Sequence, residues 1–238
     1  MSTQRQDLAT IEAQLEAEAA KVSAQVGQPD ARRISLDRSG NFIAPGGVNL
    51  GTEIEVVVVD FCSANDYYTA AYDPNNPKPP VCFARGREIA DMYPEESSPE
   101  PQAENCAVCP HNQFGSRGNG KACKNTRLLV VALTSEIDEE EPDETPLYLV
   151  SVPPTALKSF DAAALQTARM LNGPPIKAVY TVRAVSGGTY TTMQFSAPSP
   201  NPYLAAVFPL RGKAEEMLSR LPDLTNYVPT RQGAPQRR

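Results

Sequence analysis

The chain has 238 residues, 41% hydrophobic and 21% charged, which is ordinary for a folded protein and long enough to bury a sizeable core. Its net charge of −6 and pI of about 5.0 exclude a uniformly basic surface, so any polyanion must bind to a local basic region. No apolar run approaches the roughly 18 residues of a membrane span, and the start, MSTQRQDLAT, lacks the apolar core of an export signal, so we expect a cytoplasmic protein without a membrane partner.

An amphipathic helix is predicted over residues 6–26, inside an amino-terminal segment that we assign to residues 1–30. Apolar residues recur there three or four positions apart, which gives a narrow apolar seam. The seam is short and has no strict heptad, so it fits a helix docked on the domain at least as well as a coiled coil. The seam consists of Leu8, Ile11, Leu15, Ala19, Val22 and Val26.

Five β-strands are predicted in the first two thirds of the remaining chain. Their β-branched and apolar residues are typical of strands, and Glu53–Cys62 (EIEVVVVDFC) has the strongest pattern. A polar, aromatic segment, residues 63–72, and a proline-rich loop, DPNNPKPP, follow that strand. The five predicted strands are Arg33–Ala44, Glu53–Cys62, Val81–Ala84, Thr126–Leu133 and Leu147–Val152.

In the last third of the chain, the sequence predicts a helix, then a β-hairpin and then a second helix. Residues Thr155–Leu171 place their apolar side chains on one helical face, and NGPP stops that helix. Two strands, Ile176–Val185 and Thr189–Phe195, are joined by Ser-Gly-Gly and predict a β-hairpin. A helix over Tyr203–Arg220 should break near Pro209, and the polar, basic tail at 229–238 has a composition typical of disorder.

This order of elements predicts a mainly β protein with helices, of the α+β class. Several strands, a helix and a closing hairpin are the sequence order of an OB-fold, a Greek-key barrel that binds oligonucleotides, although other small barrels share it. We therefore expect an OB-like barrel over residues 31–200, with an inserted zinc-binding loop at 82–123. A carboxy-terminal helix at 201–228 and the tail at 229–238 would follow it.

Four of the five cysteines form a pattern that favours a metal site. Cys106 and Cys109 make a CxxC pair, and Cys82 and Cys123 stand on either side of it. Four thiolates can surround a tetrahedral Zn²⁺ ion as a closed, structural site. His111 can replace one thiolate, and an iron–sulfur cluster or four uncoordinated thiols remain alternatives. We expect structural zinc, because the absence of an export signal argues against disulfides.

Charges are distributed unevenly around this loop. The segment from Cys106 to Arg127 holds four basic residues and no acidic one, whereas seven acidic residues crowd into Glu136–Glu144. Aromatic side chains stand close to the basic ones in sequence, and stacking aromatics beside cations hold single-stranded nucleic acid. The sequence thus nominates as nucleic-acid-binding residues Tyr67, Tyr68, Phe114, Arg117, Lys121, Lys124 and Arg127.

No set of catalytic residues emerges. Residues 115–121, GSRGNGK, match the start of a phosphate-binding loop, but Ala122 stands where a magnesium-binding Ser or Thr is needed. Cys62 ends an apolar strand and is expected to be a buried free thiol. A single histidine limits acid–base chemistry near neutral pH. We expect a binding protein rather than an enzyme.

The segments CAVCPHNQFGS and GKACKNTR resemble a metal-binding block of certain bacteriophage-encoded single-stranded DNA-binding proteins. The resemblance extends from Val81 to Leu133 and, less clearly, to Glu53–Cys62, and it covers about a quarter of the chain. It implies an OB-like barrel that coats single strands during phage replication or recombination in the host cytoplasm, with the four cysteines as zinc ligands. The chain departs from many such proteins at its end, where QGAPQRR stands in place of an acidic tail that recruits replication partners.

The sequence therefore predicts a sequence-tolerant single-stranded DNA-binding protein that acts in phage replication or recombination and meets proteins of those pathways. The alternative is a zinc-stabilised protein–protein interaction factor of a phage that binds no nucleic acid. In that case the amino-terminal helix, the acidic run and the basic tail would contact other proteins.

Overall fold

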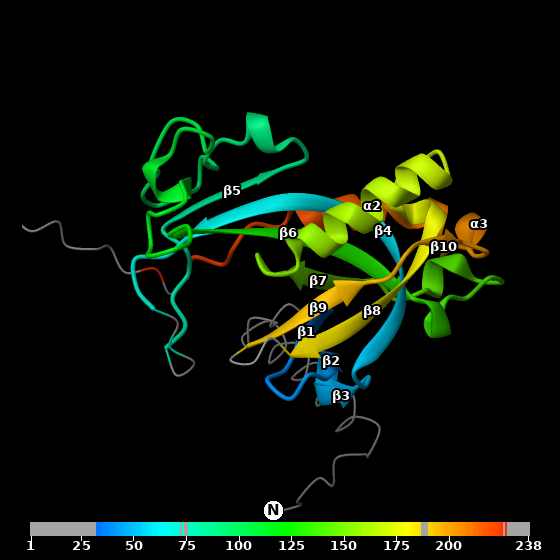
Figure 1. Cartoon of the computed structure of the whole chain (residues 1–238). Helices are drawn as coiled ribbons and strands as arrows, with labels where there is room; N and C mark the ends of the chain where they lie inside the picture. Colours follow the sequence, from blue (N-terminus) through cyan, green and yellow to red (C-terminus); the bar gives the residue numbers. More distant parts are fainter. Residues whose placement is uncertain (1–31, 72, 74–75, 187–189, 226, 228–238) are drawn as a thin grey trace, which may run out of the picture.

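The computed structural model describes residues 32–71, 73, 76–186, 190–225 and 227 (Figure 1). The helix predicted at 6–26 and the tail predicted at 229–238 lie outside these residues. In the described part of the chain, no helix is long and apolar enough to cross a membrane.

One mixed β-sheet organises the described residues, so the prediction of a mainly β, α+β fold is confirmed. The strands follow the order β10-β8-β4-β6-β7-β1-β2-β3, while β5 pairs with β4 and β9 pairs with β8. Only β1 and β7 run parallel among the described pairs. The strands are β1 (Arg33–Leu36), β2 (Phe42–Ala44), β3 (Val48–Asn49), β4 (Glu53–Tyr67), β5 (Cys82–Gly86), β6 (Cys123–Leu133), β7 (Tyr148–Val152), β8 (Ala178–Ser186), β9 (Thr191–Phe195) and β10 (Ser199–Pro200).

The long strand β4 holds the sheet together (Figure 1). One of its edges pairs with β6, and the other pairs first with β8, at residues 53–57, and then with β5, at residues 63–67. Ser63, Ala64 and Asn65 are buried between β5 and β6. This explains why the strand continues five residues beyond the predicted end at Cys62.

A β-bulge in β4 determines which side chains reach each face of the sheet. The pairing with β6 shifts between Val58 and Asp60, so Val59 is an extra residue. Such a bulge reverses the alternation of a strand. As a result, Val58 and Phe61 contact one hydrophobic cluster although they are three residues apart, and Val59 and Cys62 contact the other.

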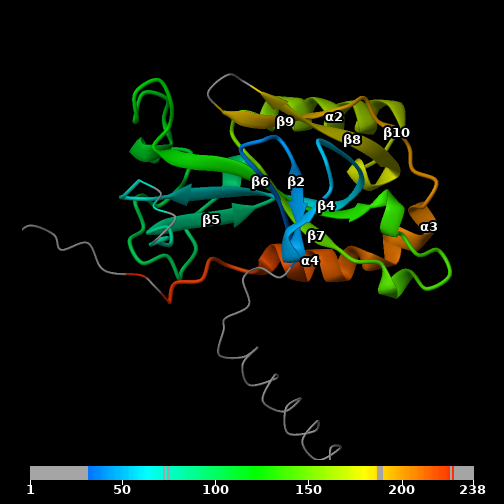
Figure 2. The same ribbon diagram turned by 90° about the horizontal axis from the view of Figure 1, so that it is seen from below.

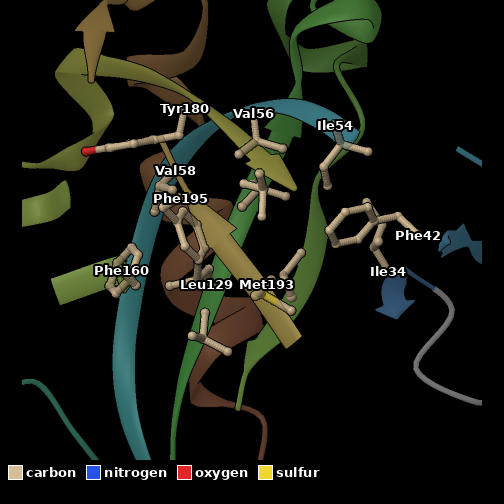
Figure 3. Packing of buried hydrophobic residues seen from close by; sticks show 14 of the residues in the cluster. Ile34, Phe42, Ile54, Val56, Val58, Leu129, Phe160, Tyr180, Met193 and Phe195 are labelled. Carbon is tan, nitrogen blue, oxygen red and sulfur yellow. The ribbon is translucent and has the colours of Figure 1, made fainter. Parts of the chain in front are cut away.

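Helix α2 (Leu157–Met170) covers one face of the sheet, as the apolar face of the predicted helix indicated. Figure 3 shows the cluster beneath it, where side chains from several strands meet. Phe160 packs edge-on against Phe61 and Phe195, with ring centroids 5.2 Å apart in each pair. This cluster is the larger of the two main cores.

The carboxy-terminal helices cover the other face. Helix α3 (Leu204–Val207) passes through a 3-10 turn at Phe208–Leu210 into α4 (Arg211–Ser219), so the predicted break near Pro209 is confirmed. Apolar residues from these helices pack on β4, β6 and β7. The helices contribute Val207, Leu210, Ala214 and Leu218.

The sheet does not close into a barrel, so this part of the predicted fold is wrong. Strands β10 and β3 end the path of strands, and no pairing joins them among the described residues. Strands β1, β2 and β3 have only four, three and two residues and cannot carry a closing ladder. Helix α2 covers the core instead.

Other predicted elements need smaller corrections. The first predicted strand is two strands, β1 and β2, because a turn separates them. In this turn Asp37 Oδ1 accepts the backbone N–H of Asn41 at 2.7 Å, and Gly40 has a φ of 88°, which glycine adopts without strain. The hairpin of β8 and β9 is confirmed.

Candidate nucleic-acid interface

The loop between Cys106 and Cys123 is folded by its own amide and hydroxyl side chains. Asn112 Nδ2 donates to the carbonyl oxygen of Cys106 at 2.8 Å, and Gln113 Nε2 donates to that of Ala107 at 2.8 Å. Ser116 Oγ donates to the Gln113 carbonyl at 2.6 Å and accepts the N–H of Ala122 at 2.9 Å. These hydrogen bonds give Asn112, Gln113 and Ser116 a structural role in the loop.

The glycines of GSRGNGK form a tight turn. Gly115 N–H donates to Gly120 O at 2.9 Å, and Gly120 N–H donates to Arg117 O at 3.1 Å. Gly115 and Gly118 have φ values of 88° and 58°, which favour glycine. The chain then enters strand β6 rather than a helix. The segment therefore lacks the helix that follows a nucleotide-binding phosphate loop.

Polar side chains connect this loop to the sheet. Asn125 Nδ2, on β6, donates to Asn65 Oδ1 on β4 at 2.6 Å and to Asn112 Oδ1 in the loop at 2.9 Å. The rings of Tyr67 and His111 are stacked, with centroids 4.2 Å apart. The loop is thus fixed to the ends of β4 and β6.

The four cysteines of the motif are brought to one place. All four are buried, free thiols that line a small cavity of about 20 Å³. Register explains part of this, because Cys82 on β5 and Cys123 on β6 are both paired with Tyr67 of β4. Cys106 is held by a backbone hydrogen bond of 2.9 Å from its N–H to Met92 O.

The thiols also influence one another electrostatically. Burial, and then the neighbouring thiolates of Cys106, Cys109 and Cys82, raise the pKa of Cys123 to about 12. Burial likewise raises the pKa of the Cys82 and Cys106 thiols. At neutral pH without a metal, these groups would be protonated.

A complete ligand sphere is not formed as the thiols stand. Among the residues that the structure describes, no group of three or more His, Cys, Asp or Glu side chains is placed to hold a metal ion. His111 stacks on Tyr67 and does not line the cysteine cavity. Four thiols around one cavity are donors that suit zinc, but they are not placed here as a complete ligand set.

A larger pocket lies beside the loop, and we call it the groove. Its volume is about 1120 Å³, and its walls come from residues 68–71, residues 77–81, residues 114–125, Pro154 and Leu157 at and before the start of α2, and Tyr227. Its described lining contains three aromatic residues and four cations but no carboxylate. These seven residues are Tyr68, Phe114, Tyr227, Lys78, Arg117, Lys121 and Lys124.

Phe114 and Lys121 form a paired feature of the groove wall. The Phe114 side chain is 80% exposed, which is unusual for so large an apolar ring. Lys121 Nζ lies 5.3 Å from the centre of this ring and 3.3 Å from Asn112 Oδ1. An ammonium group is thereby positioned beside an aromatic surface.

The residues nominated by the sequence divide into two groups. Those that line the groove are Tyr68, Phe114, Arg117, Lys121 and Lys124. Tyr67 lines the cysteine cavity instead. Arg127 is 8% exposed, and its Nη2 lies 3.3 Å from Asp161 Oδ2 of α2, so it does not reach the groove.

Two groove residues escaped the sequence analysis. Lys78 stands in the proline-rich loop, where a single lysine gives no periodic pattern. Tyr227 lies about a hundred residues from the cysteine loop, in a segment with no aromatic neighbours. Only the folded chain brings both residues to the groove.

The acidic run lies at the far end of β6 from the groove. Strand β6 begins at Cys123, beside the groove, and ends at Leu133, just before the acidic segment Glu136–Glu144 (Figure 1). Eleven residues of strand span about 35 Å, which is several times the Debye length of about 8 Å at physiological salt. The charge of the acidic segment Glu136–Glu144 therefore acts only weakly on the groove.

None of the protein-family models, curated proteins and solved structures with which the chain was compared matches it. The groove and the cysteine loop are therefore the features from which a function can be inferred.

Proposed function

We propose that this protein binds single-stranded DNA in the groove, with little dependence on sequence, and acts in phage DNA replication or recombination. The observation that carries the proposal is the composition of the groove: three aromatic residues and four cations, without a carboxylate among its described lining residues. The protein binds its ligand and performs no reaction on it. The phage setting depends on the resemblance of the cysteine block alone.

The chemistry of the groove favours a single strand over a duplex. Exposed bases stack on aromatic rings, and each stacked base contributes about 1–3 kcal/mol. In a duplex those base faces are already stacked on one another. The groove supplies apolar walls and point charges rather than a row of amide side chains that could read base edges, so tolerance of sequence is expected.

The separation of charge along β6 supports the same function. A polyanion approaching the groove meets Lys78, Arg117, Lys121 and Lys124 at short range. The acidic segment, about 35 Å away, is screened at physiological salt. A protein of negative net charge can therefore bind DNA through this end, and the proposal does not require a closed barrel.

We also propose that the four cysteines bind one structural zinc ion. The four free, buried thiols around one cavity support this, as does the donor set itself. Since the described thiols are not placed as a complete ligand set, binding one ion would require them to move closer together. The ion would add to the hydrogen bonds that already fold the loop.

A titration of a fluorescently labelled oligo-dT, followed by anisotropy at low and moderate salt, tests the function. We expect binding that weakens as salt rises, with an unlabelled duplex competing poorly. An oligo-rU competitor would show whether RNA is also accepted. Absence of binding at both salt concentrations would reject the proposal and favour the alternative, a zinc-stabilised protein–protein interaction factor.

A further inference from the structure

One wall of the groove comes from the carboxy-terminal part of the chain. After α4 ends at Ser219, the described residues 220–225 and 227 run from that helix toward β5 (Figure 2). Tyr227 thereby joins the groove lining, although the other lining residues lie between positions 68 and 157. The groove is incomplete without this segment.

Tyr227 is held in place from two sides. Its hydroxyl donates to Glu100 Oε1 at 2.6 Å, and its backbone N–H donates to Leu224 O at 2.9 Å. Glu100 is itself fixed, because its backbone N–H donates at 2.7 Å to the carbonyl oxygen of Val81, the residue immediately before β5. The carboxylate that accepts the hydroxyl thus lies in a loop that is hydrogen-bonded to the residue just before β5.

This anchoring prepares the ring for a ligand. A tyrosine has only two side-chain torsions, and a hydrogen bond at its hydroxyl fixes the direction of the ring before binding. An aromatic group that is already ordered loses less conformational entropy when a base stacks on it. The tip of Tyr227 is occupied by Glu100, while the residue as a whole is half-buried and lines the groove.

We propose that Tyr227 is a base-stacking residue of the groove, positioned by Glu100 and delivered by the segment that follows α4. This inference depends on the proposed function, because it assigns one base of the bound strand to Tyr227. Together with Tyr68 and Phe114, it gives the groove three aromatic contacts along the strand. Glu100 is a positioning residue, which acts through the tyrosine.

A simpler role for Tyr227 is that of a latch, which holds the terminal segment on the body and never touches DNA. The two roles differ in what they require of the side chain. Stacking needs the aromatic face, whereas a latch needs the hydroxyl and its acceptor. Variants Tyr227→Leu, Tyr227→Phe and Glu100→Gln separate these requirements, because leucine keeps apolar bulk without a π face and phenylalanine keeps the face without the hydroxyl.

The assay compares oligo-dT with an abasic oligonucleotide of the same length. If Tyr227 stacks a base, Tyr227→Leu weakens oligo-dT binding about 5- to 150-fold, the range for one stacked base. Tyr227→Phe and Glu100→Gln lose much less. On the abasic strand the leucine variant binds like the unaltered protein, because no base is present to stack.

A spectroscopic readout follows the ring directly. The chain has no tryptophan, so Tyr227→Trp creates a single reporter. Its emission should be quenched by oligo-dT and unchanged by the abasic strand. Melting temperatures of all variants verify that they remain folded.

The outcomes are distinguishable. If the unaltered protein binds oligo-dT with salt dependence but Tyr227→Leu binds equally well, the assignment of Tyr227 is wrong. The proposed binding of DNA in the groove would still stand. Equal losses in the leucine and phenylalanine variants, persisting on the abasic strand, would identify a latch and also overturn the assignment. If the unaltered protein does not bind oligo-dT, the proposed function fails, and this inference fails with it.

Discussion

Removing cations from the groove should reduce the salt dependence of oligonucleotide binding by a calculable amount. The described lining residues provide four cations, Lys78, Arg117, Lys121 and Lys124. If each neutralises one phosphate, the slope of log K against log salt concentration is about −2.8, because each contact on a single strand contributes about −0.7. Affinity should then fall about 50-fold between about 50 and about 200 mM salt.

The perturbation is the double variant Lys121→Ala/Lys124→Ala. Loss of two phosphate contacts should reduce the slope to about −1.4, and affinity should fall equally for oligo-dT and oligo-dC, because phosphates carry no sequence information. Stability should change little, since the contact of Lys121 with the exposed Phe114 ring is worth about 0.5–1 kcal/mol. The assay is anisotropy of a labelled oligonucleotide at a series of salt concentrations.

A matched control variant removes two positive charges from residues outside the groove. Lys213 lies on α4, with Nζ 3.1 Å from Asp143 Oδ1 of the acidic segment, and Arg169 lies in the last turn of α2. Neither residue lines the groove. The variant Lys213→Ala/Arg169→Ala should keep a slope of about −2.8. An unchanged slope in the groove variant, or an equal reduction in the control, would refute the proposed contacts.

Three further predictions concern single features of the molecule. Phe114→Ala should leave the melting temperature unchanged, because the ring is 80% exposed, yet weaken oligo-dT binding by about 1–3 kcal/mol; unchanged affinity would remove Phe114 from the interface. Asp60→Asn should lower the free energy of unfolding by about 1–3 kcal/mol in urea titrations at pH 7, because Asp60 is buried and accepts two hydrogen bonds from Arg87 at 2.8 and 2.7 Å. Burial raises the pKa of Asp60, but the hydrogen bonds from Arg87 and from the Phe61 N–H, together with the positive charges of Arg87 and Arg211, outweigh burial and hold this pKa below its ordinary value of 3.8. The stabilisation is therefore present above that value and lost as pH falls through the lower, folded-state pKa; equal stability of variant and unaltered protein at pH 7 would contradict this. Elemental analysis of freshly reduced protein should find about one zinc per chain, and a chelator should lower the melting temperature, whereas metal-free protein of unchanged melting temperature would contradict the zinc proposal.

Local patterns in the sequence were sufficient for most secondary structure. The apolar strands, α2, the hairpin of β8 and β9 and the break at Pro209 were all predicted, because each depends on periodicity or on a residue with a fixed backbone preference. The cysteine loop was recognised from the spacing of its cysteines, and the structure shows that its fold is also largely local. Its Asn, Gln, Ser and Gly residues fold it through hydrogen bonds with near neighbours in the chain.

Other features depend on contacts between distant parts of the chain, which local sequence patterns do not reveal. Residues 63–67 are mostly polar, and they form a strand because β5 and β6 pair with both of their edges. Arg127 shares the alternating face of Leu129 and Val131, and that face is the one that α2 covers, so the arginine meets Asp161 instead of solvent.

The lining of the groove likewise depends on the tertiary structure. Lys78 and Tyr227 join the groove only through contacts between distant segments. Periodicity reveals that a side chain lies on a given face of a strand or helix. It does not reveal what covers that face, because the covering element is chosen by the packing of the whole chain.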